Sequence, residues 1–230
     1  MVPTLNLGSR RKGTRHLWGR HLCLYNLNNN YVATHTSKQQ LRQELRQYRL
    51  SLSTTQQAQA AIRLAHNLKH LRQFRSSQRI ACYLASDGEI ETATIIDDIW
   101  AMGKQCYLPV LNQSRIHPLR FAHFNEDSAL VTNRFDIPEP VIHPRNLVHA
   151  VNLDLILLPL VGFDTRGNRL GMGGGFYDRC LQFMNRRQFW QNPTLVGLAY
   201  HQQLSDKIRP DAWDVKLHAI VTDQEIILAK

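Results

Sequence analysis

The first clear pattern of apolar and polar residues in the chain is that of an amphipathic helix. Apolar residues recur every three or four positions, a spacing that places them on one helix face. These residues are Leu41, Leu45, Tyr48 and Leu52. Ser37, a favoured capping residue, stands just before them. We therefore expect a helix that begins after Ser37 and packs its apolar face on the body of the protein.

Four basic residues lie beside this apolar face: Lys38, Arg42, Arg46 and Arg49. At helical spacing they fall within one arc next to the buried side. A row of charges on a helix is usually a solvated face, but it can also attract an anion. The pattern alone leaves both interpretations open.

Further along, the pattern changes from one long helix to short apolar runs. A second helix, capped by Thr54 or Thr55, is expected to bury Ala58, Ala61, Ile62, Ala65, Leu68 and Leu71. Four apolar runs predict strands, over 79–84, 105–110, 153–158 and 194–200, and a helix over 92–102 ends at Gly103. Strands that alternate with helices indicate an α/β sandwich with a largely parallel sheet. No repeat or long linker interrupts residues 37–230, which are expected to form one domain.

Residues 1–36 are predicted to be a disordered, basic N-terminal extension, because they show no sustained helical or strand period. An organelle transit peptide or a start codon placed too far upstream would give the same pattern. The net charge is +10, but seven of the 28 Lys and Arg residues precede the first acidic residue, Glu44. The rest of the chain is only mildly basic and does not indicate a nucleic-acid-binding domain.

The composition narrows the class of protein. Apolar residues make up 43% of the 230 residues, enough for a core, yet no run approaches the ~18 apolar residues of a membrane-spanning helix. An integral membrane protein is therefore excluded. The four cysteines form no C-x-x-C pair, and two of them lie in expected strands, which fits a reducing cytoplasm.

The stretch richest in chemical information is a glycine loop that follows the strand expected at 153–158. Its glycines are Gly171, Gly173, Gly174 and Gly175. Glycine backbones approach a ligand closely, their N–H groups can surround an anion, and a helix beginning there adds partial positive charge. The loop matches neither the dinucleotide fingerprint nor the P-loop. Arg166 and Arg169 before it, with Asp178 after it, favour a metal-bound polyphosphate over a plain turn.

Two more carboxylates stand out by position. Glu89 follows the strand expected at 79–84, where a carboxylate can accept paired hydrogen bonds from an amino-pyrimidine, although a solvated loop acid is the commoner outcome. Asp214 is a candidate partner of Asp178 for Mg²⁺, which usually takes one or two carboxylates together with phosphates. None of the eleven histidines is assigned a catalytic role.

Four segments in this order resemble the 5-formyltetrahydrofolate cyclo-ligase family, over residues 37–222: the helix with Lys38 and Arg42, DGEIET at 87–92, GFDTRGNRLGMGGGFYD at 162–178, and Trp213 with Asp214. The resemblance implies a single-domain three-layer α/β sandwich like that of the sugar-phosphate isomerase and CoA-transferase group. It also implies ATP- and Mg²⁺-dependent conversion of 5-formyltetrahydrofolate to 5,10-methenyltetrahydrofolate with release of ADP and phosphate. ATP would phosphorylate the formyl oxygen, and the neighbouring nitrogen would then close the ring.

The resemblance further assigns site residues. The ATP contacts would be Lys38, Arg42, Arg169, Leu170, Gly171, Met172, Gly173, Gly174, Gly175, Phe176 and Tyr177. The folate contacts would be Leu84, Glu89, Met172, Gly173, Gly174, Gly175 and Phe176, and the Mg²⁺ ligands Asp178 and Asp214. Some family members carry basic residues where this chain has Met172 and Gly174, so side chains and backbone N–H groups are both open as phosphate ligands.

The expected partners are therefore a reduced folate and ATP, with no nucleic acid and no membrane, for a cytoplasmic monomer or weak oligomer. Two other classes stay open. An isomerase or CoA-transferase relative would share the sheet but lack the Mg²⁺ carboxylates and the ATP requirement. A nucleic-acid-binding module would use the basic extension and bind in a steeply salt-dependent way.

Overall fold

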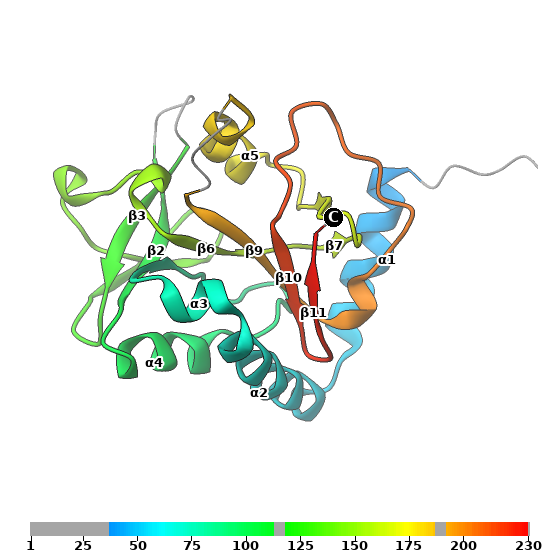
Figure 1. The fold of residues 1–230 in the computed structure, drawn as a ribbon, viewed down its shortest axis with the longest axis horizontal. Helices are drawn as coiled ribbons and strands as arrows, with labels where there is room; N and C mark the ends of the chain where they lie inside the picture. The colour runs from blue at the N-terminus through cyan, green and yellow to red at the C-terminus, as the bar shows by residue number, and fades with distance from the viewer. Residues whose placement is uncertain (1–36, 113–117, 187–191, 230) are drawn as a thin grey trace, which may run out of the picture. The chain divides into compact units, whose positions relative to one another are not determined.

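A seven-stranded sheet lies at the centre of the computed structural model, which describes residues 37–112, 118–186 and 192–229. The strand order is β11-β10-β9-β6-β1-β2-β3 (Figure 1). The five strands from β10 to β2 are parallel, and β11 and β3 pair antiparallel at the edges. The bounds are β1 Arg79–Ala81, β2 Gln105–Leu111, β3 Leu119–Phe124, β6 Leu155–Pro159, β9 Thr194–Ala199, β10 Ala219–Thr222 and β11 Ile226–Leu228. The predicted extension, 1–36, lies outside the described residues.

The apolar runs become central strands because both faces of the sheet are covered. In β6, Leu155 and Leu157 point into one core while Ile156 and Leu158 point into the other, and all four are buried. The strand predicted at 79–84 is shorter than expected, since β1 ends at Ala81. The chain stays alongside its neighbour for one more residue, because the Cys82 N–H donates to the Tyr107 carbonyl at 2.9 Å.

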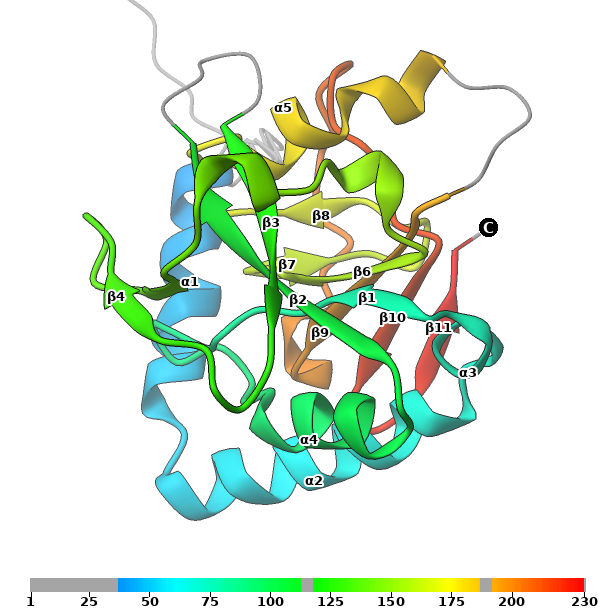
Figure 2. The same cartoon turned by 90° about the vertical axis from the view of Figure 1, so that its left-hand side faces the viewer.

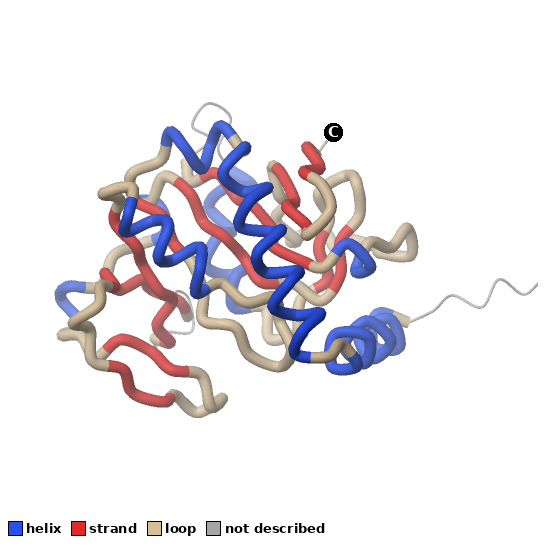
Figure 3. Tube along the Cα trace, turned by 90° about the horizontal axis from the view of Figure 1, so that it is seen from below, coloured by secondary structure: helices blue, strands red, loops and turns tan. Residues whose placement is uncertain are grey.

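Helices cover the two faces unequally. One face carries α2 (Thr54–His70), α3 (Arg72–Ser76) and α4 (Ala93–Ala101), which lie together on the lower side in Figures 1 and 2. In Figure 3, which views the protein from below, helices (blue) cross in front of the strands (red). The other face carries the short α5 (Phe176–Leu181) and 3-10 turns at Ala150–Asn152 and Gln182–Arg186. Two further 3-10 turns of the described residues, at Pro144–Asn146 and His201–Gln203, lie outside the core of that face. The described residues thus form the expected three layers. None of their helices is long and apolar enough to cross a bilayer.

The predicted details of α2 need two corrections. Ser53, not Thr54 or Thr55, caps the helix, with its hydroxyl accepting from the Gln56 N–H. Its buried face is Ala60, Ala61, Leu64, Ala65 and Leu68, whereas Ala58 and Ile62 are exposed. The buried face differs from the predicted one because Leu64 and Leu68, two large side chains one turn apart, pack against the sheet and determine which side of the helix is buried.

The predicted first helix is α1 (Lys38–Ser51), capped by Ser37 as expected. It lies near the carboxyl ends of the parallel strands rather than flat on a sheet face, beside β7 in Figures 1 and 2. Leu41, with Leu45 against it, packs in a small separate core with Val161, Leu170 and Ile208. This core holds α1 to the segment that leaves β6.

Two small hairpins were not predicted. They are β4 (Leu130–Thr132) with β5 (Pro138–Pro140), and β7 (Gly162–Phe163) with β8 (Arg169–Leu170). Strands of two or three residues are too short to show an alternating pattern in the sequence. The second hairpin carries the chain from β6 into the glycine loop, so it fixes the place of that loop.

Candidate active site

The glycine loop and α1 contact each other at the carboxyl ends of the central strands. The Arg42 Nε donates to the Gly171 carbonyl at 2.7 Å. A Cβ added to Gly173 would lie 3.8 Å from the Arg42 guanidinium carbon, so the loop backbone runs directly past this side chain. The basic residues of α1 and the loop, 129 positions apart in the sequence, therefore form one surface, which the helical pattern alone left undecided.

The loop needs glycine at two positions that have left-handed backbone conformations. Gly173 has φ +99° and Gly175, the residue that caps α5, has φ +62°. At Gly174 the ring of Phe176 lies 2.7 Å from where a Cβ would be, so any side chain at this position would require that ring to move. The residues from Gly171 to Gly174 are exposed, so their backbone N–H groups are accessible to a ligand.

The side chains around the loop divide into exposed and buried ones. Met172 is 53% exposed, whereas Leu170 is buried in the core under α1 and presents only its backbone to the loop. The Phe176 ring is half-buried and has Phe135 from the β4–β5 hairpin against it at 5.7 Å between centroids, while the Arg179 guanidinium lies 5.4 Å from its centre. An aromatic surface thus borders the glycines.

Arg169 is buried beneath the loop and is occupied by the protein itself. Its guanidinium donates to the Asp178 carboxylate and to the Val215 carbonyl, and its side chain is only 5% exposed. Burial lowers the pKa of Arg169, while the negative charges of Asp178 and Asp214 oppose that shift. Arg169 therefore ties α5 to the segment before β10, and a direct contact with phosphate would require these bonds to rearrange.

The two predicted metal ligands lie close to each other. Asp178 Oδ1 binds Arg169 and also lies 3.5 Å from the backbone nitrogen of Val215, and Val215 is the residue next to Asp214. Asp214 Oδ2 accepts from the Asp211 N–H at 2.8 Å and lies 3.7 Å from Lys38 Nζ, which also pairs with Asp211 at 2.5 Å. The predicted ATP contact Lys38 and metal ligand Asp214 are thus neighbours.

These residues fit Mg²⁺ only as part of a larger ligand set. Carboxylate oxygens are the ligands that this ion prefers, and it is commonly held by one or two of them together with phosphates. No group of three or more metal-binding side chains occurs within the described ranges. Asp178 and Asp214 therefore suit an ion that arrives with a polyphosphate and do not form a complete cage of their own.

Glu89 is buried beside the same edge of the sheet, and not in a solvated loop. Its side chain is 12% exposed, and Oε2 accepts from the Ser86 N–H at 3.2 Å. Burial raises the pKa of Glu89 to about 7, although the positive charge of Arg49 opposes that rise. Glu89 in turn raises the pKa of Tyr177 in α5, after the larger effect of burial, which puts the two predicted contacts within electrostatic range. Leu84 is half-buried and packs on the core between the strand and this turn.

The structure also reveals residues that the sequence reasoning missed. Arg49, counted among the basic residues beside the apolar face of α1, is completely buried and binds Asp87. Asp211 pairs with Lys38. The acidic residues could have been suspected from their positions in the DGEIET and PDAWD segments, but the burial of Arg49 leaves no mark in a helical pattern.

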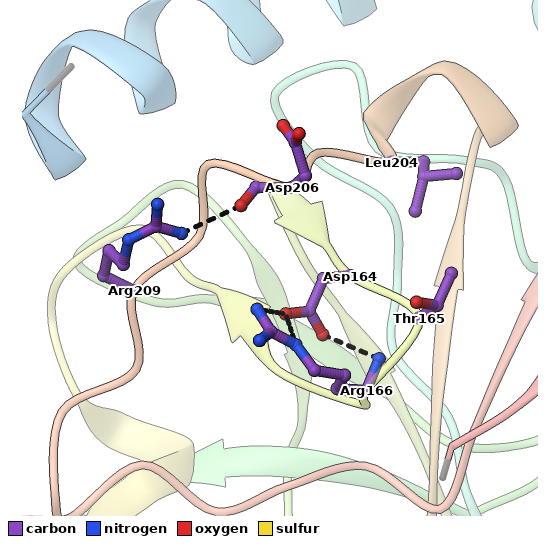
Figure 4. A pocket seen from close by; sticks show the side chains of 6 residues that line it. All are labelled: Asp164, Thr165, Arg166, Leu204, Asp206 and Arg209. Carbon is purple, nitrogen blue, oxygen red and sulfur yellow. Dashed lines mark hydrogen bonds and ion pairs between the residues drawn. The ribbon is translucent and has the colours of Figure 1, made fainter. Parts of the chain in front are cut away.

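A pocket of about 430 Å³ lies beside the turn between β7 and β8, and none of the predicted ATP, folate or metal ligands lines it. Figure 4 shows its lining residues, Asp164, Thr165, Arg166, Leu204, Asp206 and Arg209. Arg166, which the sequence associated with phosphate, binds the Asp164 carboxylate at 2.9 Å. His66 and His70 form a further pair, one turn apart on α2 with their Nε2 atoms 3.3 Å apart, but no third side chain of the described residues completes a metal group with them.

The comparisons with known proteins identify the family of this chain. The family model for the 5-formyltetrahydrofolate cyclo-ligase family matches residues 34–223. A 5-formyltetrahydrofolate cyclo-ligase of Haemophilus influenzae is 40% identical over 80% of this chain and 96% of its own length, and that of the mouse is 30% identical over 83% and 95%.

Solved structures give the same result. The 5,10-methenyltetrahydrofolate synthetase of Aquifex aeolicus superposes with a TM-score of 0.71 at 28% identity, covering 84% of this chain and 93% of its own. The synthetase of Mycoplasma pneumoniae, at 24% identity and a TM-score of 0.63 over 81% and 99%, supports the fold. With a family model spanning most of the chain and relatives matched along nearly their whole length, this protein belongs to the 5-formyltetrahydrofolate cyclo-ligase family.

Proposed function

We propose that this protein converts 5-formyltetrahydrofolate to 5,10-methenyltetrahydrofolate at the expense of ATP, in the cytoplasm. The observation that carries the proposal is the meeting of a basic helix with a glycine loop, through the contact of Arg42 with Gly171, at the sheet edge where Glu89 is buried. Open α/β sheets bind ligands at the carboxyl ends of their strands, and here that edge offers an anion surface and a carboxylate together.

In this proposal the exposed backbone N–H groups of Gly171 to Gly174 and the side chains of Lys38 and Arg42 bind the polyphosphate. Met172 in the loop, Phe176 after it and Leu84 after β1 would contact the folate, and Tyr177 would contact ATP. Lys38 would exchange its ion pair with Asp211 for a phosphate oxygen. Asp178 and Asp214 would hold a Mg²⁺ ion bound to that polyphosphate, and the ion would supply neutralisation of phosphate charge.

Glu89 would orient the folate. A buried carboxylate can accept two hydrogen bonds from the amino-pyrimidine edge of a pterin, and such charge-assisted bonds contribute roughly 1.5–3 kcal/mol each. The residues then need to do little chemistry themselves: they align the formyl oxygen with the terminal phosphate and exclude water while the phosphoryl group moves. An isomerase or CoA-transferase activity is not favoured, because the acidic cluster around Lys38 and the family both fit an ATP-dependent ligase.

The decisive assay follows the near-ultraviolet appearance of methenyltetrahydrofolate from 5-formyltetrahydrofolate, with and without MgATP. Product that forms only with MgATP is expected, and its absence would refute the proposal. Glu89→Ala should raise the folate KM by about 10- to 150-fold for each hydrogen bond lost, with the ATP KM unchanged. A normal folate KM with altered ATP binding would remove Glu89 from the folate site.

A further inference from the structure

Arg49, in the last turn of α1, is a fully buried cation that the proposed reaction does not use. Its Nη2 donates to Asp87 Oδ2 at 2.6 Å and to the Asp87 carbonyl at 2.8 Å, and its Nη1 donates to the Leu160 carbonyl at 3.3 Å. A buried guanidinium is costly unless its donors are satisfied, and here both Nη groups are paired, whereas the buried Nε–H has no hydrogen-bond partner among the described residues. The side chain therefore joins three segments: α1, the turn after β1, and the exit of β6.

The same guanidinium faces the carboxylate of Glu89, the residue proposed to bind the folate. Arg49 Nη1 lies 4.0 Å from Glu89 Oε1, while the other carboxylate oxygen of Glu89 accepts from the Ser86 N–H at 3.2 Å. One oxygen is thus directed by backbone and the other by the buried charge. Both oxygens of the Glu89 carboxylate therefore have a partner, one by a hydrogen bond and the other by an ion pair.

The turn that carries Glu89 has an unusual backbone and is pressed against α1. Asp87 has φ +50° and Gly88 has φ +72°, which are left-handed conformations that glycine adopts readily and that aspartate adopts more often than most residues with a side chain. A Cβ added to Gly88 would lie 3.2 Å from Leu50 Cδ2. Arg46 also holds Asp87, with two bonds of 2.8 Å to its carboxylate.

The exit of β6 does not depend on Arg49 in the same way. The Leu160 carbonyl also accepts from Gln203 Nε2 at 3.0 Å, and Gln203 binds the Val161 carbonyl at 2.8 Å. Loss of Arg49 would leave that segment anchored. The turn from Ser86 to Glu89 would instead lose the bonds of Arg49 to Asp87, and of the two arginines that hold Asp87 only the more exposed Arg46 would remain.

We propose that Arg49 is a positioning residue for the folate: it fixes the turn and the Glu89 carboxylate against β6 and links them to the helix that carries the ATP contacts Lys38 and Arg42. This inference rests on the proposed function, since it assigns Glu89 to the pterin. Arg49 itself is buried and would touch neither substrate.

The electrostatics of the site allow the role to be separated from a purely structural one. The charged and titratable groups that act on Glu89 or respond to it are Arg49 from α1, Asp87 in the same turn, Tyr83 after β1 and Tyr177 in α5. Of these, Arg49 favours the carboxylate anion. Removing its charge would raise the pKa of Glu89 above its present value near 7, so less of the anion would be available at neutral pH.

The test compares Arg49→Met and Arg49→Lys with the wild type. The control is Arg63→Met, which removes a half-exposed arginine from its ion pair with the buried Asp223 on the α2 side of the sheet. For Arg49→Met we expect the folate KM to rise about 10- to 100-fold while the ATP KM stays within about twofold. The folate KM of the wild type should increase as the pH falls through about 7, and in Arg49→Met this increase should begin at higher pH. Arg49→Lys, which keeps the charge, should restore the pH profile more than the affinity.

Each result decides the matter. An unchanged folate KM, or equal rises in the folate and ATP KM, would overturn the role of Arg49, and so would loss of the fold in both variants, measured by circular dichroism. If only Arg49→Met fails to fold, Arg49→Lys gives the answer. A wild type that forms no methenyltetrahydrofolate with MgATP would instead overturn the proposed function, so the two failures are distinguishable.

Discussion

Glu89→Gln should stabilise the folded protein at neutral and alkaline pH, although it should weaken folate binding. Burial raises the pKa of Glu89 from 4.5 to about 7, so the folded state resists ionising a carboxyl that the unfolded chain ionises readily. Such a group contributes its full stability below pH 4.5 and loses it as the pH rises through about 7. The penalty at pH 8 amounts to roughly 3 kcal/mol, and at pH 5 to less than about 1 kcal/mol. Glutamine keeps the size of the side chain and removes the penalty.

The measurement is urea unfolding of wild type and variant between pH 5 and pH 8, without substrates. We expect a stability difference in favour of Glu89→Gln that grows with pH toward roughly 3 kcal/mol. Glu91→Gln, an exposed acid two residues away, is the matched control and should differ from wild type by less than about 0.5 kcal/mol at every pH. A variant that is no more stable than wild type at pH 8, or an advantage that does not shrink toward pH 5, would refute the assigned burial of this charge.

Three further outcomes are expected. Gly175→Ala, at φ +62°, should cost about 1–2 kcal/mol in unfolding and raise the ATP KM, whereas Gly103→Ala, at φ +67° in open space, should cost stability but leave the ATP KM as it was. Asp178→Asn leaves the buried Arg169 without its anionic partner, so the free energy of unfolding measured in urea should fall by roughly 1.5–3 kcal/mol. As a proposed Mg²⁺ ligand, Asp178 should also be needed for turnover, so the variant should show a steep loss of kcat at limiting Mg²⁺. Wild-type kinetics under that condition would remove Asp178 from the site. Removal of residues 1–35, which carry no periodic apolar face, should change neither the melting temperature nor the turnover, and a drop in either would make them part of the domain.

Periodicity was sufficient for the elements whose burial is one-sided or complete. The helix after Ser37, the helix ended by Gly103 and the strands at 105–110 and 194–200 all occur close to their predicted places. Their patterns are long, and capping residues mark the helix ends. The short hairpins of the loop region left no such pattern, and α2 was turned on its axis because Leu64 was not counted on its buried face.

The sequence by itself determined an α/β domain with a largely parallel sheet, a glycine loop at a strand's carboxyl end and the family to which these motifs belong, because period, glycine spacing and motif order are local properties of the chain. Only the tertiary structure decided which charges face which. It buried Arg49 against Asp87, closed Arg169 onto Asp178 and paired Lys38 with Asp211. A helical period places a side chain on a face, but the partners of these charges lie from nine to 173 residues away on other elements, and the desolvation of each charge depends on how the elements pack.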